Sequence, residues 1–381
     1  MTRTRETIKR IIFVFIVFLT FVLFVISCVH DIVADDEESG KDVEVMENES
    51  KSDSESSGFF ESGGGSDKSE IIDKSEYSDE SAMYDESEDS EEPSEMDNSS
   101  QQSFDGNLMA GATHGSLGGV YVNSPHCFVY DSTNKVILYE KNAYDKAYPA
   151  SVTKLLTAAV ALEYVPIDTA FYVGKEINMV GYNSSMAYIK EGQSYALKDL
   201  LYALLLPSGN DAAHTIAVNT SRYLYGKSLS DNEAVEKFMD LCNSKLLEIG
   251  AYNTNFSGPD GYHHDDHYTT AYDMMLISLY AASFEEITDA CSTYTYYCKT
   301  LEGESMGWLN TNPLLAKHGE YYCPLVNGLK TGSTDIAGKC LCTTAEKDGK
   351  KLFIVILGAP NVDMRNRDML RIIHTFFGNC K

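Results

Sequence analysis

One stretch of the chain, residues 149–164 (Pro-Ala-Ser-Val-Thr-Lys-Leu-Leu-Thr-Ala-Ala-Val-Ala-Leu-Glu-Tyr), limits its possible folds more than any other. Between residues 155 and 162 the side chains are apolar or small on every face, apart from Thr157. A helix that is apolar all round is buried inside a protein rather than laid on its surface. Pro149 and Ser151 suit the first turn and the cap of such a helix. The stretch therefore predicts a central buried helix.

The first turn of this predicted helix carries Lys154 three residues after Ser151, so the two side chains share one face. A lysine at the mouth of a buried helix loses solvent, which lowers its pKa toward the neutral amine. A neutral amine beside a serine hydroxyl is a general base beside a nucleophile, and the helix N-terminus favours negative charge that develops there. The S-x-x-K pattern is also common at ordinary helix starts, so alone it leaves both interpretations open.

The formal net charge of −27 is spread unevenly over the 381 residues. Residues 31–105 are rich in Ser, Glu, Asp and Gly and carry most of the excess acid. Such a segment cannot bury enough apolar surface to offset its ordering entropy, so we expect a disordered acidic linker at 31–106 that acts as a spacer. Residues 107–381 are long enough to fold into a domain with a large core. The acidic balance argues against nucleic acid as a partner.

The N-terminal segment, residues 1–30, has a basic start followed by an uncharged apolar run. This pattern is typical of a signal peptide or a membrane anchor with its basic end inside. The run is just long enough to span a bilayer. It ends in Val-Ile-Ser-Cys28, which resembles the bacterial lipobox. We therefore predict an extracytoplasmic location, with the chain anchored to the cell membrane by an N-terminal helix or by lipidated Cys28.

Periodicity and turn residues predict an ordered α/β fold in the remainder. Two hairpins are indicated, one from strands at 127–130 and 136–139 and one from strands at 339–344 and 352–357. Helices are indicated at 197–206, after Pro207, and at 235–249, 271–282 and 367–377. Strands at both ends with helices between them predict a mixed α/β architecture, an antiparallel sheet covered by helices plus a helical lobe.

The nine cysteines allow few firm pairings. Cys340 and Cys342 lie two apart in a predicted strand, so they point to the same face and should not pair with each other. Cys291 and Cys298 can pair if a turn lies between them, with free, half-buried thiols as the alternative. An exported location permits disulfides, although spacing does not give their connectivity.

Two further motifs follow the S-x-x-K pair along the chain. Ser208-Gly-Asn210 lies at a tight break, where its hydroxyl and amide can face a cleft, although such a sequence alone is typical of a turn. Lys330-Thr331-Gly332 begins a predicted strand, where a cation suits a carboxylate ligand and the glycine admits a substrate backbone. Each motif is weak alone, but the order S-x-x-K, S-x-N, K-T-G is typical of penicillin-binding proteins and class A β-lactamases.

With these motifs in place, the sequence resembles the low-molecular-weight D-alanyl-D-alanine carboxypeptidases, penicillin-binding serine peptidases that trim bacterial peptidoglycan. The resemblance runs from about Cys127 to Leu357 and includes matching stretches at 149–154, 204–213, 267–273, 328–334 and 357–360. It implies a β-lactamase/DD-peptidase-like fold, a peptidoglycan pentapeptide substrate, inhibition by β-lactams, and no cofactor or metal.

The resemblance also implies residue roles. Ser151 is expected to be the acylated nucleophile and Lys154 its base. Ser208 and Asn210 are expected to shuttle protons and hold the substrate amide. The substrate-binding residues that it implies belong to one strand and are Lys330, Thr331, Gly332 and Ser333. Lys330 and Thr331 are expected to bind the terminal carboxylate, and the backbone N–H groups of Ser151 and Ser333 to form the oxyanion hole.

The sequence departs from the family pattern at both ends. Many relatives carry a β-rich C-terminal domain and a C-terminal membrane helix. This chain ends soon after Phe377, so we expect both to be absent and the N-terminal anchor to replace the helix. The acidic linker is also outside the family pattern, and the resemblance says nothing about it.

Three rival functions remain open. Residues 263–267 (His-His-Asp-Asp-His) have the side chains of a zinc site, and zinc D,D-carboxypeptidases exist, but adjacent residues rarely converge on one metal. A β-lactamase shares the acylation chemistry but needs a water activator, for which residues 165–174 offer only Asp168. A non-catalytic wall-binding or penicillin-sensing protein does not require the nucleophile–base pair.

Overall fold

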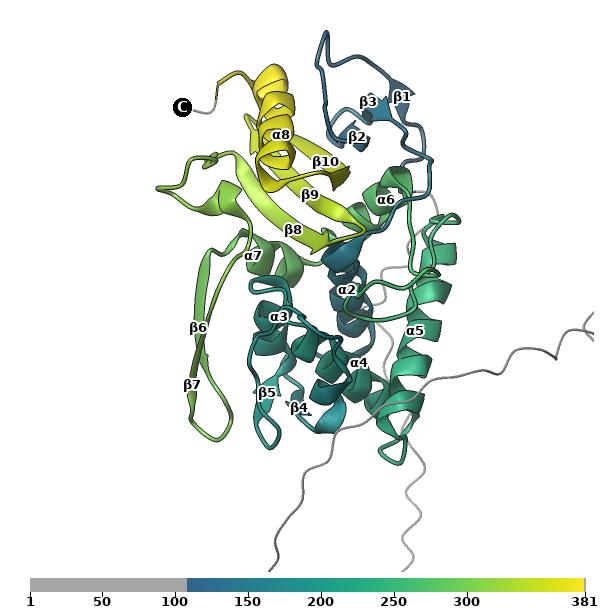
Figure 1. The fold of residues 1–381 in the computed structure, drawn as a ribbon, viewed down its shortest axis with the longest axis vertical. Coiled ribbons are helices and arrows are strands. Elements are labelled where there is room, and N and C mark those ends of the chain that lie inside the picture. The colour runs from purple at the N-terminus through teal and green to yellow at the C-terminus, as the bar shows by residue number, and fades with distance from the viewer. Residues whose placement is uncertain (1–107, 380–381) are drawn as a thin grey trace, which may run out of the picture. The chain divides into compact units, whose positions relative to one another are not determined.

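The structure, a computed structural model, describes residues 108–379 (Figure 1). The predicted signal or anchor segment, Cys28 and the acidic linker lie outside the described residues, so these remain predictions. Among residues 108–379, no helix is both long enough and apolar enough to cross a membrane.

A six-stranded sheet with the order β1-β3-β2-β10-β9-β8 forms one layer of the fold. Its strands are β1 (Thr113–His114), β2 (His126–Asp131), β3 (Val136–Lys141), β8 (Val326–Thr334), β9 (Gly338–Lys347) and β10 (Lys350–Ala359). All neighbours are antiparallel except β1, which runs parallel to β3. Both predicted hairpins, β2–β3 and β9–β10, are confirmed. The short parallel strand β1 was not predicted.

Two helices cover the sheet (Figure 1). The C-terminal helix α8 (Val362–Phe377) packs on β9 and β10, as predicted, and α6 (Ala271–Ala281) packs on β2, β9 and β10. Helix α8 begins earlier than its apolar pattern indicates because the Asn361 side chain accepts a hydrogen bond from the Met364 backbone N–H, a typical N-cap. The predicted helix-covered sheet is confirmed.

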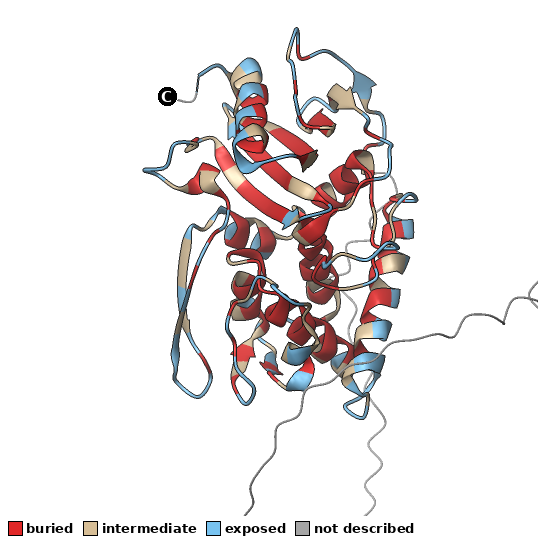
Figure 2. Cartoon of the chain, in the orientation of Figure 1, coloured by how far each residue is buried: buried red, intermediate tan, exposed pale blue. Residues whose placement is uncertain are grey.

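A helical lobe packs beside the sheet. Its helices are α2 (Lys154–Tyr164), α3 (Leu197–Leu205), α4 (Asn210–Tyr225), α5 (Asp231–Glu248) and α7 (Glu285–Ser292). Helix α2 contacts all the others and α6 as well, and its residues from Lys154 to Ala161 are buried. Figure 2 shows the greater part of α2 and α4 in the colour of buried residues. The prediction of a central buried helix is confirmed.

The start of this central helix differs from the prediction. A 3₁₀ turn, η1 (Ala150–Thr153), precedes α2, and no side chain caps either element. Ser151 therefore lies inside the 3₁₀ turn and is not a cap. A capping serine accepts backbone N–H bonds, whereas an uncapped Ser151 keeps its hydroxyl available for chemistry.

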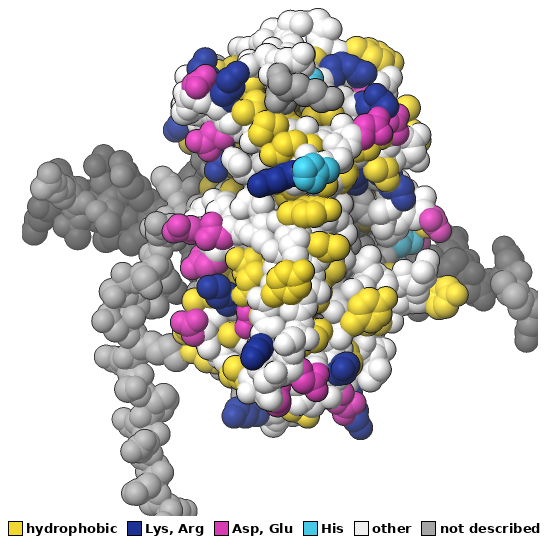
Figure 3. All heavy atoms as spheres, turned by 90° about the vertical axis from the view of Figure 1, so that its left-hand side faces the viewer, with side chains coloured by type: hydrophobic (Ala, Val, Ile, Leu, Met, Phe, Trp, Pro, Cys, Tyr) yellow, Lys and Arg dark blue, Asp and Glu magenta, His cyan; other side chains and the backbone are white. Residues whose placement is uncertain are grey.

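Several short elements were not predicted. They are β5 (Ser194–Ala196), which pairs with β4 (Ala170–Tyr172), and β6 (Thr295–Lys299) with β7 (Ser305–Leu309), η2 (Lys175–Met179), η3 (Pro313–Leu315) and helix α7. A strand after the turn at Asp168 was predicted, and β4 confirms it. The β6–β7 hairpin stands at the side of the lobe, and Figure 3 shows that face. Acidic and basic side chains are interspersed there, so this face has no field of a single sign.

The cysteine predictions had mixed outcomes. Cys340 and Cys342 do not pair with each other, as predicted, and both are free, buried thiols. The Cys291–Cys298 pairing was wrong, since both are free thiols. Cys291 packs against β8, where a Cβ added at Gly328 would lie 2.8 Å from its Cβ, whereas Cys298 belongs to the β6–β7 hairpin. Cys323 is disulfide-bonded.

Candidate active site

Ser151 lies half-buried in the 3₁₀ turn, which two neighbouring segments hold in place. Ala150 has a φ of +51°, so the backbone turns sharply just before the serine. A Cβ at Gly261 would lie 2.0 Å from the Ala150 carbonyl oxygen, and a Cβ at Gly332 would lie 3.1 Å from the Ser151 nitrogen. Glycine permits such close backbone approach. The loop at Gly261 and strand β8 therefore fix the backbone of Ser151.

Lys154, at the first position of α2, is the best-connected side chain of the site. Its Nζ donates to Ser151 Oγ at 3.1 Å, to Asn210 Oδ1 at 2.7 Å and to the Asp260 backbone oxygen at 2.5 Å. The side chain is fully buried. Burial lowers the pKa of Lys154 to about 8, although Asp260 and Asp211 act in the opposite direction. About a tenth of Lys154 is therefore the neutral amine at pH 7, and about half of it at pH 8.

The geometry around Lys154 also sets the direction of its lone pair. A neutral amine has two hydrogens, and Asn210 and Asp260 offer it two oxygen acceptors closer than Ser151. When both hydrogens are donated to these acceptors, the nitrogen lone pair faces Ser151 Oγ. This arrangement lets Lys154 accept the serine proton, which is the role of a general base.

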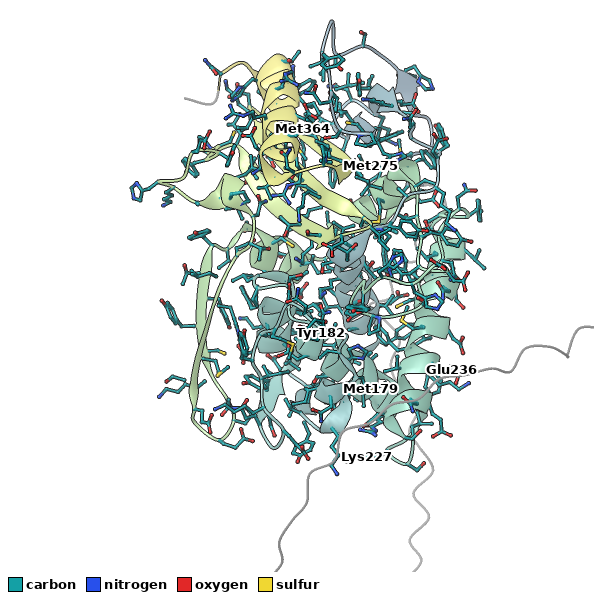
Figure 4. The ribbon with its side chains drawn as sticks, viewed as in Figure 1. Met179, Tyr182, Lys227, Glu236, Met275 and Met364 are labelled. Carbon is teal, nitrogen blue, oxygen red and sulfur yellow. The ribbon has the colours of Figure 1, made fainter. Side chains whose placement is uncertain are left out.

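Asn210 is oriented by contacts on both of its sides. It begins α4, its backbone N–H donates to the Ser185 carbonyl oxygen at 2.8 Å, and its Nδ2 donates to Ser184 Oγ at 2.9 Å. These bonds turn its amide oxygen toward Lys154. Tyr182, labelled in Figure 4, lies on the same segment with 94% of its surface exposed. The segment 181–189 therefore forms one wall of the site.

Ser208 lies at the break between α3 and α4. Its φ is +67°, and its hydroxyl is buried without a hydrogen-bond partner among the described residues. An unbonded buried hydroxyl costs free energy, so it is a group that a ligand or a transferred proton can engage. The structure thus brings three of the four predicted catalytic residues into direct contact, and it places Ser208 two residues before Asn210.

Strand β8 carries the second lysine of the site. Lys330 is 1% exposed, and its Nζ donates to the Thr331 carbonyl oxygen at 3.1 Å. Burial and the positive charges of Lys154 and Arg365 lower the pKa of Lys330 well below its ordinary value. Arg365 is itself buried in α8, and among residues 108–379 it donates to the Asn366 side chain and the Cys340 carbonyl oxygen. A carboxylate ligand placed beside Lys330 would act in the opposite direction and favour its ammonium form.

The other predicted substrate-binding residues lie along the same strand. Thr331 Oγ1 shares a hydrogen bond with Thr311 Oγ1 at 2.7 Å, Gly332 faces the Ser151 turn, and the exposed Ser333 accepts from Lys339 Nζ at 2.5 Å. β8 is the edge strand of the sheet and contacts η1. An edge strand leaves backbone groups for an extended peptide to pair with. The oxyanion hole of Ser151 and Ser333 remains a prediction.

The three imidazoles of the histidine-rich segment 263–267 lie in different surroundings. His263 packs edge-on against Tyr148, with ring centroids 4.9 Å apart, and His264 lies on the surface near Asp266. His267 is buried, and burial lowers its pKa to about 4. Residues 108–379 contain no group of three or more side chains placed to hold a metal ion.

Buried His267 supports the nucleophile turn. Its Nδ1 accepts from the Ser257 backbone N–H at 3.1 Å, which leaves the proton on Nε2 in the neutral ring. Nε2 lies 2.8 Å from Thr153 Oγ1, and that hydroxyl donates to the Ala150 carbonyl oxygen at 2.8 Å. This chain of bonds ends at the residue before Ser151.

Sequence reasoning missed the groups behind the nucleophile–base pair. Asp260 contributes its backbone oxygen to Lys154, and Asp211 accepts from the backbone N–H groups of Ala187 and Ile189 at 2.9 and 3.2 Å. A backbone acceptor has no residue signature, so no pattern could reveal Asp260. The sequence did offer a signal for Asp211, because this residue directly follows the S-x-N motif.

Acyl transfer from a serine activated by a lysine is the chemistry that this geometry suits. The fold is that of the DD-peptidases: the crystal structure of the Streptomyces K15 DD-transpeptidase superposes with a TM-score of 0.62 at 27% identity, covering 68% of this chain and 98% of that one. The chain belongs to the D-alanyl-D-alanine carboxypeptidase family, whose model matches residues 118–361.

Two further comparisons agree with the family. D-alanyl-D-alanine carboxypeptidase DacF of Bacillus subtilis is 29% identical over 244 residues, which are 63% of this chain and 59% of the relative. The cefotaxime-bound structure of penicillin-binding protein D2 from Listeria monocytogenes superposes with a TM-score of 0.55 at 26% identity, covering 68% of this chain and 98% of that one. The chain thus spans 59% of the length of DacF.

Proposed function

We propose that this protein is a serine-type D-Ala-D-Ala carboxypeptidase that removes the terminal D-Ala from peptidoglycan stem pentapeptides and is acylated by β-lactams. The observation that carries the proposal is the 3.1 Å contact between Lys154 Nζ and Ser151 Oγ at the mouth of a buried helix. The family and the names of the relatives support the same activity.

In the proposed acylation step, Lys154 takes the proton of Ser151 Oγ, and Oγ attacks the carbonyl carbon between the two D-Ala residues. The oxyanion is stabilised by the backbone N–H groups of Ser151 and Ser333. The C–N bond then breaks, and the amine of the departing D-Ala receives the proton through Ser208. Water hydrolyses the resulting ester, which restores the Ser151 hydroxyl and releases the shortened peptide.

The same proposal assigns Lys330 and Thr331 to the terminal carboxylate of the substrate. Burial and the charge of nearby Arg365 disfavour the ammonium form of Lys330, and a substrate carboxylate beside it would stabilise that form. Edge strand β8 would pair with the extended peptide, which places the scissile bond beside the Ser151 turn.

Intact-protein mass spectrometry after treatment with penicillin tests the nucleophile. Wild type should gain one penicilloyl adduct, and Ser151→Ala should gain none. Lys317→Ala is a matched control on the exposed surface and should be acylated like wild type. An adduct that maps to any other residue contradicts the assignment of Ser151.

A β-lactamase is the second candidate, and the position of Asp168 disfavours it. Asp168 follows the C-terminal end of α2, whereas Ser151 precedes its N-terminal end. A helix of this length separates the two by roughly 16 Å. Asp168 therefore lies too far away to activate water at the ester. The purified enzyme should release D-Ala from a peptide ending in D-Ala-D-Ala yet stay penicilloylated for minutes; rapid penicillin turnover without D-Ala release would favour the β-lactamase.

We also propose that the protein acts outside the cytoplasm, tethered to the cell membrane by its N-terminal segment. The basic start, the apolar run and Cys28 support this location. Replacing Cys28 with Ala separates the two modes of anchoring. A lipoprotein loses its lipid label and its membrane retention, whereas an anchor helix retains the protein in the membrane fraction.

A further inference from the structure

The backbone is strained immediately before the proposed nucleophile. Ala150 has a φ of +51°, a conformation that residues with a Cβ rarely adopt. Such a conformation costs free energy and persists only where the surrounding structure holds it in place. The contacts that hold Ala150 therefore also determine where the backbone places Ser151.

A run of hydrogen bonds ends on the carbonyl oxygen of this strained residue. The Ser257 backbone N–H donates to His267 Nδ1 at 3.1 Å, so Nδ1 carries a lone pair and the ring is neutral. The one ring proton is then on Nε2, which donates to Thr153 Oγ1 at 2.8 Å. The Thr153 hydroxyl in turn donates to the Ala150 carbonyl oxygen at 2.8 Å. The direction of every bond is fixed, because the run starts at a backbone donor and ends at a backbone acceptor.

The imidazole of His267 is itself held firmly. The Phe256 ring stacks on it, with ring centroids 4.8 Å apart and an angle of 7° between the planes. Two residues further on, Thr269 exchanges two backbone hydrogen bonds of 2.8 Å with Ala147. His267 and Thr153 are 2% and 1% exposed, so solvent does not compete for their hydrogen bonds. The imidazole is thus a fixed point beside the nucleophile turn.

We propose that His267 and Thr153 are positioning residues for the proposed nucleophile. The imidazole orients the Thr153 hydroxyl, and that hydroxyl holds the strained turn at Ala150. Ser151 Oγ is thereby kept at its 3.1 Å contact with Lys154 Nζ. Both residues act through the backbone of Ala150 and not on the substrate. The inference rests on the proposed function of Ser151 and Lys154, and it gives a role to a histidine that lies outside the three sequence motifs.

Removing the Thr153 hydroxyl should slow the chemical step and leave binding intact. Thr153→Val replaces the hydroxyl with a methyl group of similar size, so the Ala150 carbonyl oxygen loses this donor. The rate constant of the acylation step should fall about a hundredfold, because a displacement of about 1 Å between reacting groups has an effect of that size. The dissociation constant of the non-covalent complex should change by less than about twofold. Thr153→Ser keeps the hydroxyl and should restore the acylation step. Stopped-flow kinetics with a chromogenic cephalosporin measure both constants.

Glycine at position 150 tests the strain directly. Glycine adopts a positive φ without the penalty of a Cβ, so the turn then depends less on the Thr153 hydroxyl. In the Thr153→Val background, Ala150→Gly should raise the rate constant of the acylation step about tenfold, which is the scale of the strain that it removes. If Thr153→Val acted by loosening the fold in general, an added glycine would lower the rate further, because glycine adds conformational freedom.

His267→Phe tests the link between the imidazole and the hydroxyl. It keeps a ring that can stack on Phe256 but removes both nitrogens, so the Thr153 hydroxyl loses the donor that orients it. The acylation step should slow about tenfold, less than in Thr153→Val, because the hydroxyl is still present. The double variant should be no slower than Thr153→Val alone, since His267 acts through that hydroxyl.

A buried hydroxyl away from the turn is a matched control. Ser221 is fully buried and donates to the Ala234 carbonyl oxygen at 2.7 Å. It lies roughly 16 Å further along α4 than Asn210. Ser221→Ala should lower the thermal unfolding temperature but leave the acylation step at the wild-type rate. All rates are compared at a temperature at which every variant is folded.

The outcomes separate this inference from the proposed function. Wild-type enzyme that is acylated on Ser151, together with a normal acylation step in Thr153→Val, overturns the inference and leaves the proposed function intact. A loss confined to the dissociation constant, or one that Ala150→Gly does not reverse, also overturns it. Wild-type enzyme that is not acylated overturns both. If Thr153→Val does not fold, His267→Phe and its reversal by Ala150→Gly decide in the same way.

Discussion

The two buried lysines of the site, Lys154 and Lys330, are the same residue type at the same depth but have different partners. Lys154 donates to three oxygens from three segments, whereas Lys330 donates to the carbonyl oxygen of its own neighbour. Burial lowers both pKa values. The partners of Lys154 direct its lone pair at a hydroxyl, and the sparse contacts of Lys330 leave its charge for a ligand. The roles of the two lysines therefore follow from their partners.

The assignment of different roles to the two lysines is tested most strongly by removing the capacity of Lys154 to become neutral. Lys154→Arg keeps the positive charge but cannot give up its proton. Acylation by penicillin should slow by about a thousandfold or more, equivalent to about 4 kcal/mol in the barrier. Stopped-flow or mass-spectrometric acylation rates measure this. A Lys154→Arg enzyme with near-normal rates would show that Lys154 is not the base.

The pH dependence of the reaction rate tests the roles of both lysines without any mutation. The rate of acylation should rise about tenfold per unit below the pKa of Lys154, which is about 8, because only the amine form accepts the serine proton. Carboxylate binding should weaken as pH rises, because Lys330 has a lowered pKa and binds only as a cation. A bell-shaped profile of kcat/KM for a D-Ala-D-Ala peptide is therefore expected. A flat profile across the pKa of Lys154 would contradict both assignments.

The corresponding change at the other lysine should be much milder. Lys330→Arg keeps a cation on β8, so the substrate carboxylate retains its partner, although the larger guanidinium must fit a buried position. We expect a loss of about tenfold in kcat/KM, carried mainly by KM, which corresponds to about 1.4 kcal/mol. Steady-state kinetics with the same peptide measure it. Equal losses for Lys154→Arg and Lys330→Arg would remove the distinction between the two lysines.

The sequence predicted those parts of the site that depend on residues close together along the chain. The all-round apolar pattern of 155–162 is sufficient to predict a buried helix, and S-x-x-K places two side chains on one face of it. The parts it missed depend on distant backbone. Lys154 and Asp260 are separated by 106 positions and meet through a carbonyl oxygen, which every residue has.

Two errors have the same physical origin. Ser151 was predicted to cap the helix, but the sharp turn at Ala150 places it inside a 3₁₀ turn, which packing against Gly261 and Gly332 stabilises. The Cys291–Cys298 pairing assumed a local turn, whereas Cys291 faces β8. The short strands β6 and β7 were missed because each has only five residues and neither shows a regular alternation of apolar and polar residue types in its sequence.

The smallest expected effect concerns metal. The zinc interpretation required the imidazoles of His263, His264 and His267 to converge, and they lie against Tyr148, in solvent and beneath Thr153 respectively. His267 has both ring nitrogens engaged, so it cannot bind a metal without breaking the bonds that support the turn before Ser151. D-Ala release should therefore be unchanged after treatment with EDTA and exhaustive dialysis. His264→Ala, which removes a surface imidazole, should be equally neutral. Activity that is lost with EDTA and restored by zinc would instead place the reaction on a metal, and the comparison of the two lysines would no longer explain catalysis.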